Sequence, residues 1–292
     1  MSDLDITSLE GVPVTHQRAD VGHGVTLHYV EAGEGPLVLL LHGFPEFWYS
    51  FRQQIPALAR AGFRVVAPDL RGYNRSDRPR EVSAYTSEQL ADDVAGLIRA
   101  CGEESALVVG HDWGGGVAWA FAMAHPAMLR RLAILNCPHP ARLLRGLASP
   151  VQLARSWYMF FFQIPRLPEA LLAFDRVDRL LDSIRREARP GAFTDQDLAL
   201  YREALLQPGA LRAMINYYRA AARHRPKLRP VEAPVLVLWG DLDRHLGHAL
   251  ARPDARLVPD VRVVHIAGAS HWVQHDAPDE VNERLIGFLR EA

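Results

Sequence analysis

The chain has 292 residues, of which 49% are hydrophobic and 23% charged, and its formal net charge is −1. This is the composition of an ordinary globular protein, which disfavours a disordered chain and a general nucleic-acid-binding role. The 33 basic residues include a single lysine, Lys227, and the arginines are scattered among acidic residues instead of forming a basic stripe. The length fits one α/β core that carries an insertion.

The two cysteines, Cys101 and Cys137, stand far apart in the sequence and form no Cys-x-x-Cys pair. They predict neither a disulfide framework nor a zinc site, and they fit a reducing compartment. Residues 1–10 include Asp3, Asp5 and Glu10 and lack the apolar segment of a secretory signal. The longest uncharged apolar stretch is shorter than the ~18 residues that a membrane span needs. These features predict a soluble cytoplasmic protein with no membrane partner.

The first strand-like runs, residues 12–17 and 25–30, alternate apolar and polar side chains as half-buried antiparallel strands do. Later runs are short and almost continuously apolar, which is typical of parallel strands buried on both faces. These runs cover residues 37–41, 64–67, 106–109, 131–135, 235–239 and 261–266. Segments with helical periodicity lie between most of the runs or close the chain, at residues 51–61, 87–100, 115–125 and 279–290. The alternation predicts an α/β fold with a mostly parallel sheet and helices on both faces.

The alternation stops between Pro138 and Pro230, where the sequence is helical and contains no buried-strand run. This segment leaves the sheet after one predicted strand and returns before the next. We therefore expect an inserted helical lid over the C-terminal edge of the sheet, where α/β folds bind ligands. The predicted division is a core of residues 1–137 and 229–292 with a lid, or cap, at residues 138–228.

The sharpest motif is GHDWGG at residues 110–115, where a predicted buried strand runs into a glycine-rich turn and then a helix. It has the form of a nucleophile elbow, with Asp112 in the place that serine usually takes. Backbone N–H groups and the helix dipole favour an anion there, so an ionised Asp112 can attack carbon directly. The alternative is that Asp112 only caps the helix that begins near Trp113.

From about Val25 to the C-terminus, the chain resembles the α/β-hydrolase-fold epoxide hydrolases, a family close to the haloalkane dehalogenases. The resemblance is carried by five blocks, HGFPEFW at 42–48, DLRGYNRSD at 69–77, GHDWGG at 110–115, GDLD at 240–243 and GASHW at 268–272. Asn74 is a departure, because the wider superfamily often has glycine there, but a loop position leaves the chemistry unaffected. The resemblance implies an α/β-hydrolase fold and an enzyme that converts an organic epoxide to a vicinal diol without a metal or organic cofactor.

Thirteen histidines compete for the role of general base, and His271 is the predicted one. It follows the last predicted strand, in a loop at the same sheet edge as the elbow, and it matches the family's catalytic histidine. An unshifted histidine titrates near pH ~6.5, so it can accept a proton from water. We expect His42 to belong to a structural turn and His111 to point away from the nucleophile, since it is one residue along.

The orienting acid should follow the predicted strand at residues 235–239, where both Asp241 and Asp243 are available. The resemblance selects Asp243 and leaves Asp241 as a loop-capping residue. The resulting order of Asp112, Asp243 and His271 is the nucleophile, acid and base order of α/β-hydrolases.

The resemblance also places an oxyanion hole at the backbone N–H groups of Phe44 and Trp113. The Phe44–Pro45 bond resembles a family position that is often cis. Phe47 and Trp48 follow in the same block and are predicted to contact substrate, although such aromatic residues could also be ordinary core residues.

Two lid segments, residues 156–163 and 216–219, resemble those that supply the paired tyrosines of epoxide hydrolases. The resemblance places these phenols at Tyr158 and Tyr218. A phenol with a pKa of about 10 can donate a hydrogen bond to an epoxide oxygen and protonate an alkoxide. The alternatives are simple aromatic packing within the lid and a role for Tyr217, which the register disfavours.

The apolar lid, with Trp157 and Phe161 as predicted substrate contacts, indicates a small hydrophobic epoxide. The closest alternative is a haloalkane or haloacid dehalogenase, which uses the same ester chemistry. Haloalkane dehalogenases often carry a halide-binding Asn at the position of Phe44, and fluoroacetate dehalogenases carry arginines at positions that resemble Trp113 and Gly116. Both departures favour an epoxide as the substrate.

A non-catalytic ligand receptor of this fold would be expected to lack a triad member. The sequence leaves open whether the protein is a monomer or a homodimer.

Overall fold

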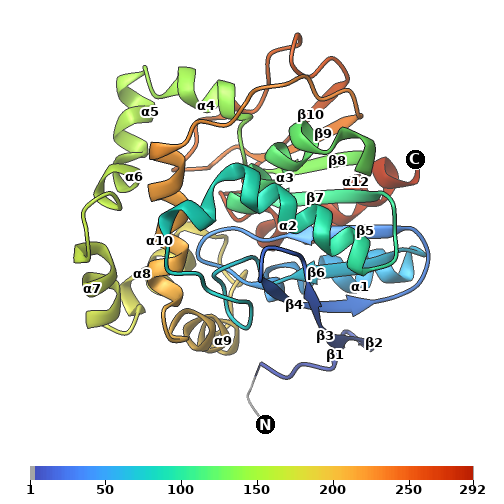
Figure 1. The fold of residues 1–292 in the computed structure, drawn as a ribbon, viewed down its shortest axis with the longest axis horizontal. Coiled ribbons are helices and arrows are strands. Elements are labelled where there is room, and N and C mark those ends of the chain that lie inside the picture. The colour runs from blue at the N-terminus through green and yellow to red at the C-terminus, as the bar shows by residue number, and fades with distance from the viewer. Residues whose placement is uncertain (1–3, 292) are drawn as a thin grey trace.

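The computed structural model describes residues 4–291. Asp3, which the sequence analysis counted in the N-terminal segment, lies outside the described residues. Near the N-terminus, β1 (Ser8–Leu9) and β2 (Val12–Pro13) form a short antiparallel pair. An eight-stranded sheet follows, with the strand order β10-β9-β8-β7-β5-β6-β4-β3 (Figure 1). Its strands are β3 (Thr15–Asp20), β4 (Thr26–Ala32), β5 (Leu37–Leu41), β6 (Arg64–Pro68), β7 (Ala106–His111), β8 (Leu129–Leu135), β9 (Val235–Gly240) and β10 (Val261–Ile266).

The sheet is antiparallel at one end and parallel elsewhere, as the hydrophobic patterns predict. β4 pairs antiparallel with both β3 and β6, while the strands from β6 to β10 pair in parallel. The predicted run at 12–17 is divided between β2 and β3. The division falls at Val14, whose N–H donates to the carbonyl of Thr7 at 2.9 Å.

The central strands form the core of the molecule. Every side chain of β5, β7 and β9 is buried, which explains their continuous apolar sequences. The expectation that residues 261–266 are buried on both faces is wrong, because only Ile266 of β10 is buried. β10 is an edge strand, and Arg262 and His265 reach solvent.

Helices cover both faces of the sheet (Figure 1). On one face, α2 (Ser87–Ala100) packs against α3 (Trp113–Ala124), and on the other α1 (Gln54–Arg60) packs against α12 (Pro278–Arg290). α3 is apolar around most of its circumference because it lies buried between α2 and the sheet. The short elements are α11 (Val273–Asp276) and the 3₁₀ helices Trp48–Phe51, Val82–Tyr85, Pro126–Met128 and His248–Leu250.

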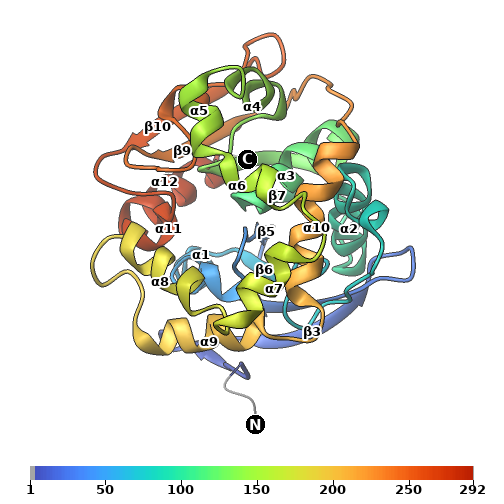
Figure 2. The ribbon, with the colours of Figure 1, turned by 90° about the vertical axis from the view of Figure 1, so that its left-hand side faces the viewer.

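Between β8 and β9 the chain forms only helices, in the stretch that we call the inserted segment (residues 138–228). These helices are α4 (Pro140–Gly146), α5 (Pro150–Arg155), α6 (Trp157–Phe161), α7 (Leu167–Phe174), α8 (Asp178–Glu187), α9 (Asp195–Leu205) and α10 (Ala210–Arg223). In Figure 2 they lie in front of the strand ends. The inserted segment therefore stands over the carboxyl edge of the sheet.

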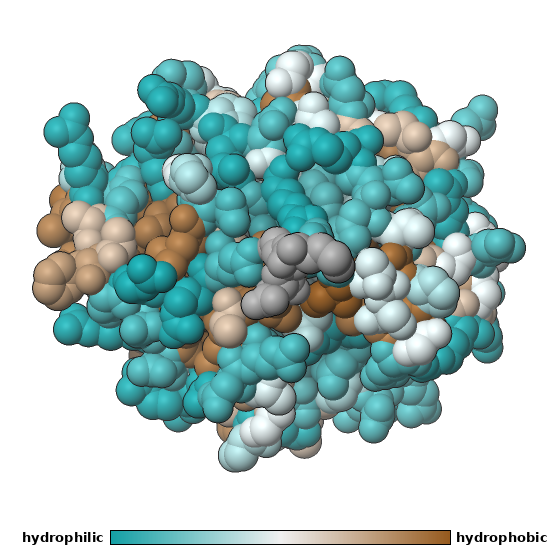
Figure 3. Space-filling model, turned by 90° about the horizontal axis from the view of Figure 1, so that it is seen from below, coloured by the Kyte–Doolittle hydropathy of each residue, from teal (hydrophilic) through white to brown (hydrophobic). Residues whose placement is uncertain are grey.

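The surface of the inserted segment is unusually apolar. Most of the exposed large hydrophobic residues in the described chain belong to it, namely Leu144, Val151, Leu153, Trp157, Phe160, Ile164, Leu167, Leu171, Phe174 and Leu228. Figure 3 shows hydrophobic surface gathered at its left end, the end that the inserted helices form in Figure 1. Across residues 4–291, no helix combines the length and apolar character needed to cross a bilayer.

Candidate active site

The candidate site lies where several parallel strands end at one edge of the sheet. Asp112 follows β7 directly, and the loops after β9 and β10 carry Asp243 and His271. Phe44 follows β5 in the same way. Because the carboxyl ends of parallel strands share one edge, the sheet brings together four residues that are far apart in the sequence.

Asp112 sits on a sharp turn between β7 and α3, with φ 48° and ψ −120°. This is a left-handed φ that a non-glycine residue rarely adopts, so the surrounding packing must hold the turn. The neighbouring glycines make that packing possible. A Cβ on Gly114 would lie 1.9 Å from the carbonyl oxygen of Leu41, and one on Gly43 would lie 2.4 Å from Cβ of Asp112.

The Asp112 carboxylate faces the site and does not cap α3. Its Oδ1 accepts the backbone N–H of Phe44 at 2.8 Å, and its Oδ2 lies 3.4 Å from Nε2 of His271. The side chain makes no capping hydrogen bond to the helix, so the capping alternative is wrong. Burial alone would raise the pKa of Asp112, but the hydrogen bond and charge of His271 lower it below its usual value. The carboxylate is therefore held ionised.

His271 and Asp243 form a close buried pair. Nδ1 of His271 donates to Oδ2 of Asp243 at 2.8 Å, which leaves Nε2 facing Asp112. Burial would lower the pKa of His271, but the charges of Asp243 and Asp112 together hold it well above its usual value. Burial would raise the pKa of Asp243, yet the His271 charge and hydrogen bonds bring it down to about 2. The arrangement favours an imidazolium ion between two carboxylates.

The competing histidines and the competing aspartate have other partners. His42 Nε2 accepts the N–H of Leu70 at 3.0 Å, within a structural turn as predicted. His111 points away from Asp112, as predicted, and its Nε2 donates to the carbonyl of His271 at 2.9 Å. Asp241 does not have the expected capping role, because its carboxylate lies 2.8 Å from His265 Nδ1 at the sheet edge.

The two predicted oxyanion donors are the backbone N–H groups of Phe44 and Trp113. That of Phe44 already donates to Oδ1, and that of Trp113 belongs to the first residue of α3, where helical N–H groups have no partner within the helix. The Phe44–Pro45 bond is cis. The Phe44 N–H thus donates to an oxygen of residue 112, while a role for the Trp113 N–H as the second oxyanion donor stays a prediction.

The inserted segment brings Tyr158 of α6 and Tyr218 of α10 together, with ring centroids 5.8 Å apart and ring planes 81° apart. The Tyr218 ring also packs at 4.9 Å from Trp113 and 5.5 Å from Phe44. Burial first, and then the charge of Asp112, raise the pKa of both phenols above the ordinary value, so both keep their proton. Tyr217 points elsewhere, because its hydroxyl donates to a main-chain carbonyl, that of Arg71, at 2.7 Å.

The four predicted substrate contacts occupy different environments. Phe161 packs on the small apolar cluster of Phe162, Ile215 and Tyr218, beside the paired tyrosines. Phe47 and Trp48 are fully buried in the main core. Trp157 is 63% exposed on the outside of α6. A role in substrate binding stays a prediction for all four.

Sequence reasoning missed Asn136, which follows β8 at the same sheet edge. Its Nδ2 donates to Oδ2 of Asp243 at 2.7 Å, and its Oδ1 accepts the N–H of Gly240 at 2.9 Å. Asn136 therefore fixes the acid against the end of β9. The available signal was a polar side chain directly after the predicted strand at 131–135.

Sequence reasoning also missed Glu46, which is fully buried beneath the site. Its carboxylate lies 2.8 Å from Nδ1 of His111 and 3.1 Å from Nε2 of His275, and accepts from Ser50 Oγ at 2.7 Å. It also accepts the N–H of Gly43 at 3.2 Å. Burial would raise its pKa, but the two histidines hold the pKa of Glu46 well below its usual value. The Glu46 carboxylate therefore connects Gly43, in the loop before Phe44, to His111, whose imidazole donates to the carbonyl of His271.

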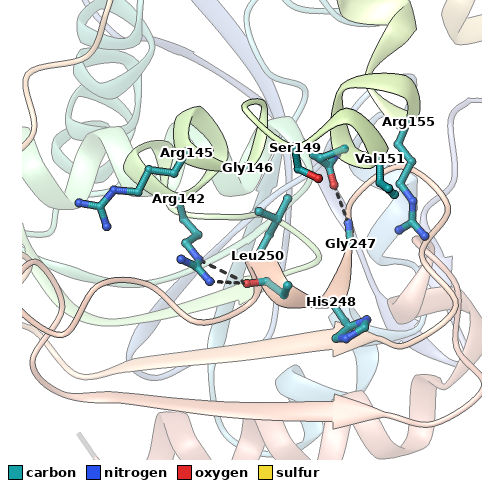
Figure 4. Close-up of a pocket in the computed structure, with 11 residues that line it drawn as sticks. Arg142, Arg145, Gly146, Ser149, Val151, Arg155, Gly247, His248 and Leu250 are labelled. Atoms are coloured by element: carbon teal, nitrogen blue, oxygen red, sulfur yellow. Dashed lines mark hydrogen bonds between the residues drawn. The ribbon is translucent and has the colours of Figure 1, made fainter.

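A pocket of about 340 Å³ lies between α4, α5 and the loop at residues 247–250 (Figure 4). Arg142 spans one side and donates to the carbonyl of Ala249 at 2.9 Å, while Gln152 Oε1 accepts the N–H of Gly247 at 3.0 Å. None of the predicted site residues lines this pocket.

Within residues 4–291, no three His, Cys, Asp or Glu side chains are grouped so that they could hold a metal ion.

Comparison with known proteins agrees with the fold. A family model described as alpha/beta hydrolase fold matches residues 36–278, which makes the protein an α/β hydrolase. The chain is 42% identical over 276 residues to the AB hydrolase superfamily protein YfhM of Bacillus subtilis, covering 92% of this chain and 96% of that protein. It is 40% identical over 280 residues to Epoxide hydrolase 4 of Mus musculus, covering 92% of this chain and 77% of that protein.

Among solved structures, a Bacillus megaterium epoxide hydrolase in complex with an inhibitor is similar with a TM-score of 0.86 and 32% identity. The similarity covers 94% of this chain and 100% of that chain. The chain belongs to the epoxide hydrolase family of the α/β hydrolases.

Proposed function

We propose that the protein hydrolyses a hydrophobic organic epoxide to a vicinal diol through a covalent ester on Asp112. The observation that carries the proposal is the pair of adjacent phenols, the partly buried Tyr158 and the buried Tyr218, beside the Asp112 turn. An ionised carboxylate is a nucleophile toward carbon, and two phenols are donors for the oxygen that leaves that carbon. The names of the relatives point to the same substrate class.

In the first step, an Asp112 carboxylate oxygen attacks one epoxide carbon while the C–O bond of that carbon breaks. The electron pair of the breaking bond passes to the epoxide oxygen, which Tyr158 and Tyr218 hold by hydrogen bonds. One phenol gives its proton to the resulting alkoxide, which is far more basic. The product of this step is a hydroxyalkyl ester of Asp112.

In the second step, water attacks the ester carbonyl carbon and loses a proton to Nε2 of His271. The negative charge on the carbonyl oxygen is held by the N–H groups of Phe44 and Trp113. Collapse of this intermediate breaks the ester C–O bond, and the leaving alkoxide takes the remaining water-derived proton from the intermediate, which releases the diol and restores the Asp112 carboxylate. His271 keeps the proton taken from water and so ends the cycle protonated, as in the free enzyme, and Asp112 keeps one oxygen from water.

The charge pattern of the site suits this order of steps. In the free enzyme, the charges of Asp243 and Asp112 raise the pKa of His271 and favour its protonated form. An ester at Asp112 carries no charge, so one of the two causes disappears and the pKa of His271 falls. The imidazolium then gives its proton, through solvent, to the phenolate left by the first step, and the neutral imidazole is available as the base for the second step.

The inserted segment at residues 138–228 acts in this proposal as a lid that supplies the two phenols, while the core at residues 1–137 and 229–292 supplies the nucleophile, acid and base. Cys101 and Cys137 are both free and buried, which is consistent with a reducing compartment, and we place the enzyme in the cytoplasm.

An assay of the purified protein against matched epoxides and alkyl halides tests the substrate class. Each epoxide is paired with the alkyl halide of the same carbon skeleton, and both diol and halide release are measured. We expect diol formation from the epoxides and no halide release above the uncatalysed rate. Halide release without diol formation would instead identify a dehalogenase.

A further inference from the structure

The end of α8 contacts both loops that carry the acid and the base. Glu187, the last residue of α8, lies with Oε2 at 2.7 Å from Nε2 of His245. His245 belongs to the acid loop, and its backbone N–H donates to Oδ1 of Asp243 at 2.8 Å. Two residues beyond Glu187, the side chain of Arg189 reaches the other loop.

Arg189 donates to three main-chain carbonyls on either side of His271. Its Nε donates to Gly268 at 2.9 Å, its Nη2 to Ala267 at 2.6 Å and its Nη1 to Asp276 at 2.9 Å. Gly268 has φ 69°, and a Cβ there would lie 3.1 Å from Nη2 of Arg189. The guanidinium and the loop are therefore fitted closely to each other.

A buried carboxylate extends this contact to the residue that precedes the base. Asp276 accepts the backbone N–H of Arg189 on Oδ1 at 2.7 Å and the N–H of Ser270 on Oδ2 at 2.6 Å. Ser270 directly precedes His271, and its Oγ accepts the N–H of Trp272 at 3.1 Å. The chain on both sides of the base is thus tied to the position of Arg189.

We propose that Arg189 is a positioning residue for the base, an inference that rests on the proposed function of His271. Arg189 acts through the loop, because its donors all go to main-chain carbonyls and to the Asp276 carboxylate. The planar guanidinium can serve several carbonyls in one fixed geometry, which an ammonium group cannot. The inserted segment thereby sets the geometry of ester hydrolysis as well as supplying the phenols for ester formation.

The test is the Arg189→Met variant, which keeps much of the aliphatic stem and removes the side-chain hydrogen bonds. Misplacement of a reacting group by about 1 Å can cost ~100-fold in rate, and we expect a smaller displacement to slow ester hydrolysis about tenfold. Ester formation depends on Asp112 and the two tyrosines, so its rate should change less than about twofold. Rapid-quench single turnovers with intact-protein mass spectrometry measure the two rates separately. Arg189→Lys should recover part of the loss.

The matched control is Arg185→Ala on α8, four residues before Arg189, because Arg185 pairs with the exposed Asp195 instead of the catalytic loops. It should leave both rates unchanged. Wild-type hydrolysis in folded Arg189→Met, or an equal slowing of both steps, overturns the positioning role. If that variant does not fold, Arg189→Lys decides the matter by the same two rates, with its thermal unfolding checked. A wild-type protein that opens epoxides without forming an ester contradicts the proposed mechanism instead.

Discussion

Replacing His271 with Gln is expected to let the enzyme form its ester and then leave it trapped there. Ester formation uses Asp112, Tyr158 and Tyr218, none of which is removed by the substitution. Ester hydrolysis loses its general base, which typically costs about 10²- to 10⁴-fold in rate. After mixing with an epoxide, intact-protein mass spectrometry should find the substrate mass added, and peptide mapping should place it on Asp112.

A suitable control for this variant is His265→Gln, because His265 is half exposed at the sheet edge and pairs with Asp241. It should turn over at the wild-type rate and accumulate no ester. Normal turnover of a correctly folded His271→Gln protein would show that another group is the base, and the assigned triad would then be wrong.

Removing both phenols, in the double variant Tyr158→Phe and Tyr218→Phe, is expected nearly to stop epoxide opening. Loss of one preorganised oxyanion donor typically costs about 10²- to 10³-fold in rate, and the remaining phenol can partly compensate in each single variant. Each single substitution should therefore slow ester formation without abolishing it. Pre-steady-state kinetics with a chromogenic or fluorescent epoxide measures the rate of ester formation directly.

Tyr217→Phe is the control for the double variant, since Tyr217 is adjacent in sequence but its hydroxyl serves the Arg71 carbonyl. It should leave ester formation close to wild type. Hydrolysis of a preformed ester should also be little affected in the double variant, because the charge of that step develops on the Asp112 carbonyl oxygen. Unchanged ester formation in a folded double variant would assign the tyrosines to packing and favour the dehalogenase alternative.

Much of the fold could be predicted because buried parallel strands leave a simple signal. The runs at 37–41 and 261–266 coincide with β5 and β10, and the helical segment without strands coincides with the insertion between β8 and β9. The burial of β10 could not be predicted. An apolar run does not show whether its strand lies in the middle of the sheet or at its edge, and that position depends on strand order.

The residues at strand ends could also be predicted, since strand order matters little once the strands are parallel. Asp112, Asp243 and His271 follow three such strands, and Asn136 follows a fourth and could have been included by the same reasoning. Arg189 could not be predicted, because it lies in a helical, arginine-rich segment. Its carbonyl partners in the base loop are 78 and 79 positions away. Such a contact is set by how the inserted helices settle on the core and leaves no local pattern.

The central claim is the covalent ester on Asp112, and one turnover of excess enzyme in heavy-oxygen water tests it most directly. Water attacks the ester carbonyl, so the diol leaves with an original carboxylate oxygen and Asp112 keeps an oxygen from water. Mass spectrometry of the peptide that contains Asp112 should therefore find the heavy label in its carboxylate, while the diol from that first turnover stays unlabelled. Heavy label in the diol and none in Asp112 would show that water attacks the epoxide directly, and would contradict the ester mechanism.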